Sequence, residues 1–372
     1  ANITSVEEAS KFGKLVIQDY DGRMKPVNTY ASELLRKLSK HDNYQGHNAD
    51  QLFLSMNESP LLWYNIPVIY LKMKKADTIR SLIGTDPADK YVTLADFFTD
   101  RGMYKLAPYL EEAYKAQVPT AVQKEFKEAD QRVNLLYNTL DGRSLKMFPV
   151  PGDENNTWIS PVDYREGNYK FEDSLYGNFI NTGFKAYLIT LNQAKETGDY
   201  SEADAMLQGL KTTQQKLGAE VMIPDEKIDM DIRYNKYDIF KKLFSWYMYA
   251  GTLMFILIIV RIFNDRSKII KFLVGMFRWI IVGLFLLHTA GLITRWYISG
   301  HAPWSDAYES LIYVAWATML FGFITGLSKR ETPKKKDDPS STISKVMSPI
   351  LGIFNRKSSD LTIAAAAFVV SM

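Results

Sequence analysis

Long runs of apolar residues dominate the last third of the chain. They centre on about 243–263, 274–294 and 309–327, and Arg278 is the only charged residue inside the second run. A helix that crosses a bilayer needs about 20 mostly apolar residues. Three such runs in close succession therefore predict membrane-spanning helices at these positions, because the core of a water-soluble protein rarely contains so many.

A fourth apolar run begins at Leu361 and reaches the last residue, Met372. A helix of this length extends about 18 Å at 1.5 Å per residue, whereas the hydrocarbon layer is about 30 Å thick. The first residue, Ala1, is not a methionine, and no signal peptide follows it. We therefore expect the chain to be a piece of a longer protein, with the fourth span truncated.

The polar and apolar positions of residues 1–238 follow the period of helices along much of their length. Apolar spacing and turn signals predict helices at 28–41, 106–116, 119–140, 173–196 and 201–217. Asn28 or Thr29 is the expected cap of the first helix, and Pro119 is expected in the first turn of the third.

Three stretches of this part have patterns that are not helical. Residues 14–23 indicate a short strand with a turn at Asp21-Gly22. Residues 60–72 are apolar and contain two prolines, which predicts a strand or loop packed on the core. Residues 141–170 are rich in glycine, proline and asparagine and are expected to form a long ordered loop. The chain as a whole is expected to be mainly α.

Charge divides the chain into two expected domains. Residues 239–372 hold 16 lysines and arginines against 7 aspartates and glutamates, whereas residues 1–238 hold 29 against 35. An acidic first part and a basic, apolar second part predict a mostly helical soluble domain, 1–238, followed by a polytopic α-helical membrane domain, 239–372. Residues 229–242 enter the first span without a flexible linker, so we expect the soluble domain to sit rigidly on the membrane.

The positions of lysine and arginine predict the orientation in the membrane. The loop between the first two spans holds four, the loop after the second holds only Arg295, and the segment after the third holds eight. Because cytoplasmic loops are enriched in these residues, residues 295–309 and the domain 1–238 are expected on the outer side. The lysines at 334–336 indicate a topology anchor beside membrane lipid, and we expect no nucleic-acid partner.

Composition excludes several kinds of catalytic site. The chain has no cysteine, which rules out disulfides, thiolate metal sites and cysteine nucleophiles, and it has only four histidines. Motifs of phosphate-binding loops, serine hydrolases and zinc proteases are absent from the sequence. His41 and His47, with Asp42 and Asp50 nearby, form either a metal site or a polar loop that follows a helix.

Candidate chemistry concentrates in residues 288–316. His288 lies inside the second predicted span, where ionisable residues usually face a cavity or a partner. His301 follows the outer end of that span. A helix would place it about 20 Å from His288, too far for both histidines to bind one ligand, so two separate binding positions are expected. Neutral imidazole binds haem iron axially, and flat aromatic side chains pack on the macrocycle.

The residues around the two histidines allow structural as well as functional interpretations. Trp296, Trp304, Tyr308, Tyr313 and Trp316 can contact a haem or form an ordinary interfacial belt. Arg295 can bind a haem propionate or extend to the interface. Pro303 is expected to end the helix, and Asp306 and Glu309 are favourable at the start of the third span.

The sequence block RWYISGHAPWSDAYESLIYVAW closely resembles the start of the membrane domain in system II cytochrome c assembly proteins, the CcsA/ResC-type haem-handling component of cytochrome c synthase. The matching residues are Arg295, Trp296, Gly300, His301, Pro303, Tyr308, Glu309, Ser310, Leu311 and Trp316. Residues 12–39 and 233–240 are also similar to the extracytoplasmic part of fused forms of that synthase.

The resemblance implies cytochrome c biogenesis. Proteins of this family carry haem, here expected as haem b, across the bacterial inner membrane and present it at the periplasmic face for attachment to the CxxCH motif of apocytochrome c. Expected partners are the apocytochrome, thiol-reducing proteins and the rest of the synthase. Expected haem contacts are His288, His301, Arg295, Trp296, Trp304 and Tyr308, with His288 or His301 as the iron ligand; Gly300, Pro303, Glu309 and Ser310 are expected to be structural.

Two other functions stay open from the sequence. The chain can be a membrane-anchored scaffold whose outer domain docks partner proteins, or a small-molecule transporter with polar residues in its spans. It can also be part of a haem lyase that this portion does not complete, because the tryptophan-rich segment typical of the family does not occur in it.

Overall fold

The structure is a computed structural model that describes residues 3–167, 169–264, 266–300, 302, 307–327 and 360–370. Packing of the backbone divides the chain into two compact units, Ala1–Ile232 and Arg233–Met372. Each unit contains its own cluster of buried apolar side chains. Helices make up most of both units, which confirms the expected mainly-α fold.

The first unit combines helices with short antiparallel strand pairs. Its helices are α1 (Val6–Phe12), α2 (Val27–Ser39), α3 (Ala49–Glu58), α4 (Pro60–Trp63), α5 (Asp77–Ile83), α6 (Ala107–Lys115), α7 (Ala121–Leu140), α8 (Pro161–Arg165), α9 (Ser174–Thr197), α10 (Ser201–Leu217) and the start of α11 (Asp225–Tyr237). Its strand pairs are β1–β2 (Val16–Gln18, Met24–Pro26), β3–β4 (Asn43–Tyr44, His47–Asn48), β5–β6 (Ile69–Tyr70, Tyr91–Val92) and β7–β8 (Phe148–Pro149, Trp158–Ile159).

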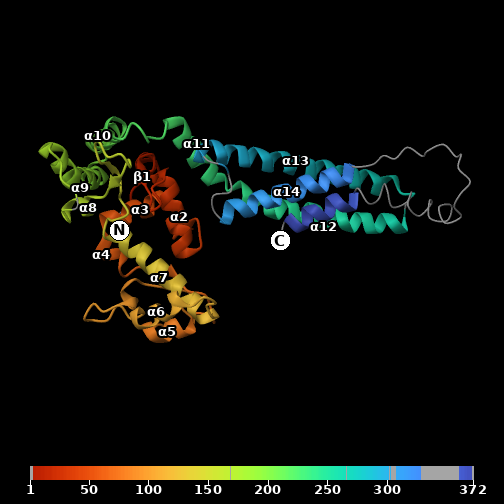
Figure 1. Cartoon of the computed structure of the whole chain (residues 1–372), viewed down its shortest axis with the longest axis horizontal. Coiled ribbons are helices and arrows are strands. Elements are labelled where there is room, and N and C mark those ends of the chain that lie inside the picture. Colours follow the sequence, from red (N-terminus) through yellow and green to blue (C-terminus); the bar gives the residue numbers. More distant parts are fainter. Residues whose placement is uncertain are drawn as a thin grey trace, which may run out of the picture. The chain divides into compact units, whose positions relative to one another are not determined.

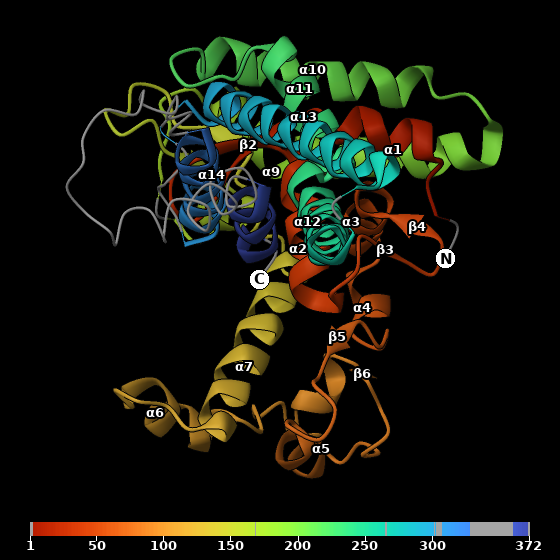
Figure 2. The same cartoon turned by 90° about the vertical axis from the view of Figure 1, so that its right-hand side faces the viewer.

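Helix α7 connects two parts of this unit. It packs on α2 and α3 near one end and on α6 near the other, as Figures 1 and 2 show. Its buried face carries Phe126, Ala129, Val133 and Leu136, which follow the 3–4 spacing of one helical face. These side chains belong to one continuous core that extends from α1 to α10.

The structure corrects several details of the predicted elements. Neither Asn28 nor Thr29 caps α2, which starts at Val27 without a side-chain cap. The Asn28 amide instead donates to Asp50. Pro119 precedes the cap of α7, and Thr120 forms a capping box with Gln123. Within 141–170, the expected long loop contains the β7–β8 hairpin and α8.

Other sequence-based expectations agree with the structure or were incomplete. The turn at Asp21-Gly22 joins β1 to β2, and Gly22 has the positive φ of 79° that such a turn favours. The stretch 60–72 forms the short helix α4 and then β5. The helices α1, α3, α5 and α11 were not predicted; α1 and α5 have only seven residues each, too few to show a helical period.

Buried charges in the first unit occur with specific partners. Lys195 on α9 donates to both carboxylate oxygens of Glu58 on α3, at 2.8 Å each, and both side chains are almost fully buried. On α7, Asp130 accepts hydrogen bonds from Tyr104 at 3.0 Å and from Tyr114 at 2.8 Å. A buried charge is tolerated only with such partners, so these contacts stabilise the arrangement of the helices that supply them.

Asp50 on α3 is a buried carboxyl group with incomplete hydrogen bonding. One carboxylate oxygen accepts a 2.8 Å hydrogen bond from the Asn28 amide, whereas the other has no hydrogen-bond partner among the described residues. A side chain at Gly13 would collide with this carboxyl group. Burial raises the pKa of Asp50 to about 6, and the hydrogen bond from Asn28 only partly opposes the shift.

We expect Asp50→Asn to stabilise the protein at neutral pH. The folded state holds the Asp50 proton more tightly than the unfolded state, so stability decreases as pH rises from 3.8 to about 6. The asparagine side chain does not ionise, so the variant keeps this free energy of unfolding. The expected gain is up to about 3 kcal/mol at pH 7.5 and little at pH 4. Unfolding of the full chain at both pH values measures the gain. The exposed Asp21→Asn is the control, and an equal effect of Asp50→Asn at both pH values would contradict the prediction.

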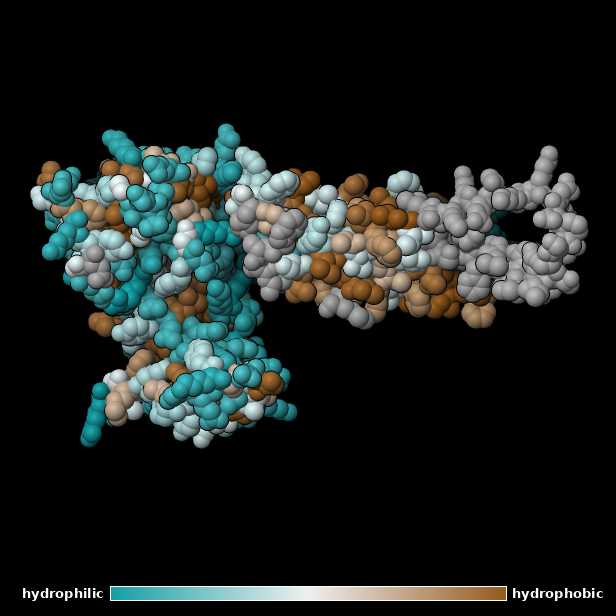
Figure 3. Space-filling model, in the orientation of Figure 1, coloured by the Kyte–Doolittle hydropathy of each residue, from teal (hydrophilic) through white to brown (hydrophobic). Residues whose placement is uncertain are grey.

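The second unit contains long apolar helices. They are α12 (Ile239–Phe263), α13 (Lys268–Ser299), α14 (Ala307–Leu327) and a shorter helix, Asp360–Val370. Candidate membrane spans lie within Asp225–Phe263, Lys268–Ser299 and Tyr308–Thr325, as the apolar runs predict. Figure 3 shows hydrophobic side chains along the surface of this unit, and Trp279, Leu311 and Phe321 are largely exposed. An apolar exterior of this kind suits lipid, so the chain is a membrane protein.

Helices α12 and α13 pack along a regular seam. On α12 the buried positions Phe240, Leu243, Tyr247, Ala250 and Met254 alternate in steps of three and four. On α13 the buried positions Val274, Ile281 and His288 recur every seven residues. This is the spacing of coiled-coil packing, in which the same face of each helix stays turned toward its neighbour.

The helix 360–370 packs through small residues and a buried carboxylate. Gly251 on α12 meets its backbone at Ala364, and Gly322 on α14 meets the methyl group of Ala366. Small residues allow such close approach in membrane bundles. At the start of this helix, the buried Asp360 pairs with Arg261 and Arg278. These two pairs explain how Arg278 is accommodated in the second apolar run.

Candidate functional site

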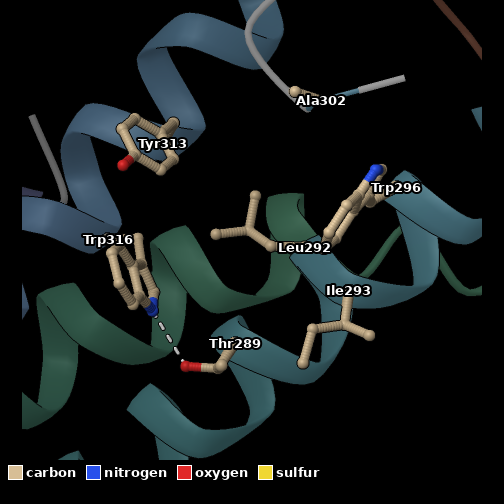
Figure 4. Close-up of a pocket in the computed structure, with 7 residues that line it drawn as sticks. All are labelled: Thr289, Leu292, Ile293, Trp296, Ala302, Tyr313 and Trp316. Carbon is tan, nitrogen blue, oxygen red and sulfur yellow. Dashed lines mark hydrogen bonds between the residues drawn. The ribbon is translucent and has the colours of Figure 1, made fainter.

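A cavity of about 270 Å³ opens between α13 and α14. Its lining is almost entirely apolar and is made by Thr289, Leu292, Ile293, Trp296, Ala302, Tyr313 and Trp316 (Figure 4). The four residues from α13 have the spacing i, i+3, i+4 and i+7, which places them on one face of that helix. Because one helix face and two aromatic residues of α14 enclose it, the cavity suits a flat apolar molecule.

The aromatic wall of the cavity is held in place from both helices. The Trp316 Nε1 donates a 2.8 Å hydrogen bond to Thr289 Oγ1, which joins α14 to α13 (Figure 4). The Trp316 ring also stacks on Phe285 and on Tyr313, with ring centroids 5.8 Å apart in both pairs. These contacts fix the orientation of the indole, so it can act as a rigid surface for another planar ring.

His288 lies next to this cavity along α13 but does not line it. Its imidazole faces α12, where the ring centroid is 5.5 Å from that of Phe240 and 6.0 Å from that of Tyr247. The side chain is buried, and neither ring nitrogen has a well-formed hydrogen bond among the described residues; the backbone of Ile312 on α14 is close enough to interact with the ring. An imidazole of this kind retains a free electron pair for a ligand.

Arg295 forms an ion pair with Glu309 near the C-terminal end of α13. The Arg295 Nε donates to Glu309 Oε1 at 2.7 Å, and the Glu309 side chain is fully buried in the first turn of α14. Tyr234 also interacts with Arg295. The arginine expected either to bind a carboxylate or to extend to the interface thus has a carboxylate of the chain itself beside it.

The other predicted site residues take different positions. Trp296 lines the cavity, whereas Tyr308 is half exposed and is not part of the lining. Gly300 ends α13 with φ 72°, a left-handed conformation that favours glycine. Ser310 lies in the first turns of α14. His301, Pro303 and Trp304 lie outside the described residues.

Sequence reasoning missed the contributions of Thr289, Leu292, Ile293 and Tyr247. The first three share the helical spacing of Trp296, so a search along that face of the predicted span would have found them. Tyr247, in the first apolar run, could have been noticed because it lies seven residues after Phe240, which comes just before that run. The sequence does not distinguish apolar residues that face lipid from those that face a cavity. Leu292 and Ile293 were missed for this reason.

No family model matches the sequence. The chain is 33% identical over 324 residues to protein NrfI of Wolinella succinogenes, covering 84% of this chain and 34% of NrfI. Shorter matches include the cytochrome c biogenesis protein CcsA of Lotus japonicus, 47% identical over 47 residues, and that of Lactuca sativa, 44% identical over 59 residues. They cover 13% and 16% of this chain and 15% and 18% of those proteins.

These matches cover only part of each relative. The chain spans about a third of the length of NrfI and less than a fifth of the length of these two CcsA proteins. The match to NrfI includes most of this chain and thus more than its membrane helices. The resemblance that the sequence indicates is confirmed: the chain is similar to NrfI over most of its own length and to the CcsA proteins over a shorter segment.

Proposed function

We propose that this chain takes part in cytochrome c biogenesis by delivering haem through a membrane to the site of its covalent attachment to apocytochrome c. The relatives named as cytochrome c biogenesis proteins and the membrane-spanning helices support this proposal. The observation that carries it is the aromatic-walled cavity, because Trp296 and Trp316 on its wall belong to the sequence block that resembles those relatives.

The residues present fit a haem in part. The indole rings of Trp296 and Trp316 and the phenol ring of Tyr313 offer planar surfaces, and the apolar lining favours the macrocycle over water. A cavity of about 270 Å³ is slightly smaller than typical pockets for drug-sized ligands, so it holds an edge of the ring. Among the described residues no imidazole lines it, so the cavity supplies packing and leaves iron ligation to residues elsewhere.

Iron ligation in this proposal comes from His288 or His301. The buried imidazole of His288 has the backbone of Ile312 beside it, which leaves at least one ring nitrogen for an axial ligand. His301 is the candidate for a second station at the outer face, with Trp304 and Tyr308 beside it in sequence. Arg295 reaches a haem propionate only by sharing or exchanging its contact with Glu309.

The proposed setting is the bacterial inner membrane, with the domain 1–238 in the periplasm and 239–372 in the membrane. The four lysines and arginines between the first two spans and the eight after the third support this orientation. The proposed partners are an apocytochrome with a CxxCH motif, thiol-reducing proteins, the remaining part of a cytochrome c synthase and membrane lipid. The proposed ligand is haem b, carried as cargo.

Haem binding by the purified protein tests the proposal. We expect a Soret band, and we expect Trp296→Ala to weaken haem binding by about fivefold because it removes one aromatic wall worth about 1 kcal/mol. Trp279→Ala is the matched control: it changes the same residue type on α13, but at an exposed position outside the cavity. Titration of the two variants with haem gives the affinities.

Three outcomes would count against haem delivery. A colourless protein that co-purifies stably with other subunits would favour a scaffold. Accumulation of another small molecule in vesicles would favour a transporter. Equal weakening by Trp279→Ala and Trp296→Ala would show that the cavity has no special part in binding.

A further inference from the structure

Two polar side chains interrupt the apolar seam between α12 and α13. Among the buried residues of the seam, α12 contributes Phe240, Leu243, Ala250 and Met254 around Tyr247. On α13, His288 continues the seven-residue series of Val274 and Ile281. A polar residue at such a seam position lowers stability and is retained where it specifies an arrangement or a function.

The two polar residues lie at the same level of the seam. The ring centroids of Tyr247 and His288 are 6.0 Å apart with the ring planes inclined by 57°. Tyr247 is fully buried and only 3% of the His288 surface is exposed. The pair is therefore enclosed by protein and is separate from the cavity between α13 and α14, whose lining includes neither residue.

Their polar atoms have no hydrogen bonds to the described residues. The Tyr247 hydroxyl group and both ring nitrogens of His288 are buried without a partner. Buried polar groups in native proteins are nearly always hydrogen-bonded, because leaving them unpaired costs the full free energy of their desolvation. The backbone of Ile312 lies beside the His288 ring and serves at most one of its nitrogens. The Tyr247 hydroxyl group and the other ring nitrogen are therefore expected to satisfy each other, directly or through a small molecule.

We propose that Tyr247 is a positioning residue for His288: its hydroxyl group shares a hydrogen bond with one ring nitrogen, directly or through one water molecule. At a centroid separation of 6.0 Å the two rings are close enough for rotation of either side chain, or one bridging water molecule, to connect the hydroxyl group to a ring nitrogen. The hydrogen bond fixes which ring nitrogen carries the proton. It also fixes the orientation of the ring.

With one ring nitrogen of His288 bound to Tyr247, the other ring nitrogen keeps a fixed direction and can donate its electron pair to a metal ion. Histidines that bind metals generally use their other nitrogen for a hydrogen bond that sets the tautomer and the ring orientation. This part of the inference rests on the proposed role of His288 in binding haem iron. The pairing of Tyr247 with His288 does not depend on it and exists in the haem-free protein.

The test is ring-nitrogen NMR of the full chain labelled with ¹⁵N-histidine, in its haem-free form. The signals of His288 are assigned by their loss in His288→Gln. We expect two well-separated ring-nitrogen signals, one protonated and one not, as a fixed neutral tautomer produces. In Tyr247→Phe, which keeps the ring and removes only the hydroxyl group, the two signals should move toward their average. Tyr249→Phe is the matched control, because Tyr249 lies on the same helix and is largely exposed.

The outcomes separate the pairing from the proposed function. Unchanged His288 signals in Tyr247→Phe, or an equal change in Tyr249→Phe, would overturn the pairing whether or not the protein binds haem. A change confined to Tyr247→Phe supports it. With haem added, Tyr247→Phe should then alter the visible spectrum of the bound haem; if instead His288→Gln binds haem with an unchanged spectrum, His288 is not an iron ligand although the pairing stands.

Discussion

Replacing Arg80 by methionine is expected to destabilise the α5 region of the first unit by about 3–5 kcal/mol, among the largest effects of any single substitution in this chain. The Arg80 side chain is fully buried, and its guanidinium donates to the backbone carbonyl groups of Leu71, Lys72 and Asp89 at 2.8, 3.1 and 2.7 Å. It also donates to Asp77 at 3.1 Å. Methionine fills a similar volume but leaves these carbonyl groups without a donor.

Hydrogen exchange of the full chain measures this effect where it occurs. Backbone amides between 71 and 89 should open more readily in Arg80→Met than in the unchanged protein. Arg101→Met is the control, because Arg101 is exposed and its loss should change little. Arg80→Lys should be intermediate, since an ammonium group cannot reach acceptors in the fixed directions of the guanidinium. If both variants at 80 behave like the control, the network is not important for stability.

Replacing Glu309 by glutamine is the second change with a large expected effect. It leaves the Arg295 guanidinium, which is largely buried, without the anion that lies 2.7 Å from it. Breaking one partner of a buried ion pair typically costs about 3–5 kcal/mol. We expect a loss of this size in the contact between α13 and α14, and with it a distortion of the cavity that these helices enclose.

The double variant Arg295→Gln with Glu309→Gln distinguishes the ion pair from other effects. Removing both charges should restore part of the stability lost in Glu309→Gln, because no uncompensated charge remains. Lys271→Gln is the control, a charge removed from an exposed position on α13. Unfolding in detergent measures the change. A double variant no more stable than Glu309→Gln would show that Arg295 and Glu309 do not stabilise the helices as a pair.

The helices predicted from the sequence are those with long and regular patterns. Those expected at 106–116, 173–196 and 201–217 occur as α6, α9 and α10 with ends shifted by at most one residue. Short elements such as α1 and α5 escaped because one or two helical turns produce too few apolar positions to show a period. The cap of α2 was wrong because the amide of Asn28 makes a hydrogen bond to Asp50, and a residue distant in sequence competes with local capping.

The candidate site divides in the same way. The sequence block that includes Trp296 and Trp316 indicated the segment that the structure shows around the cavity. The pairing of Arg295 with Glu309 was not foreseen, because each residue also had a plausible role by itself. The enclosure of His288 by Phe240 and Tyr247 depends on the α12 face, which no motif in the sequence marks.

Length, apolar runs and charge distribution were enough to establish from sequence a mainly helical membrane protein with an acidic first part. These properties depend on the summed transfer of many side chains from water, which does not require knowing their neighbours. Which face of each span meets protein could come only from the packed helices. In lipid an apolar side chain is equally favourable on either side of a helix, so its transfer energy does not reveal whether it faces a cavity, a partner helix or the bilayer.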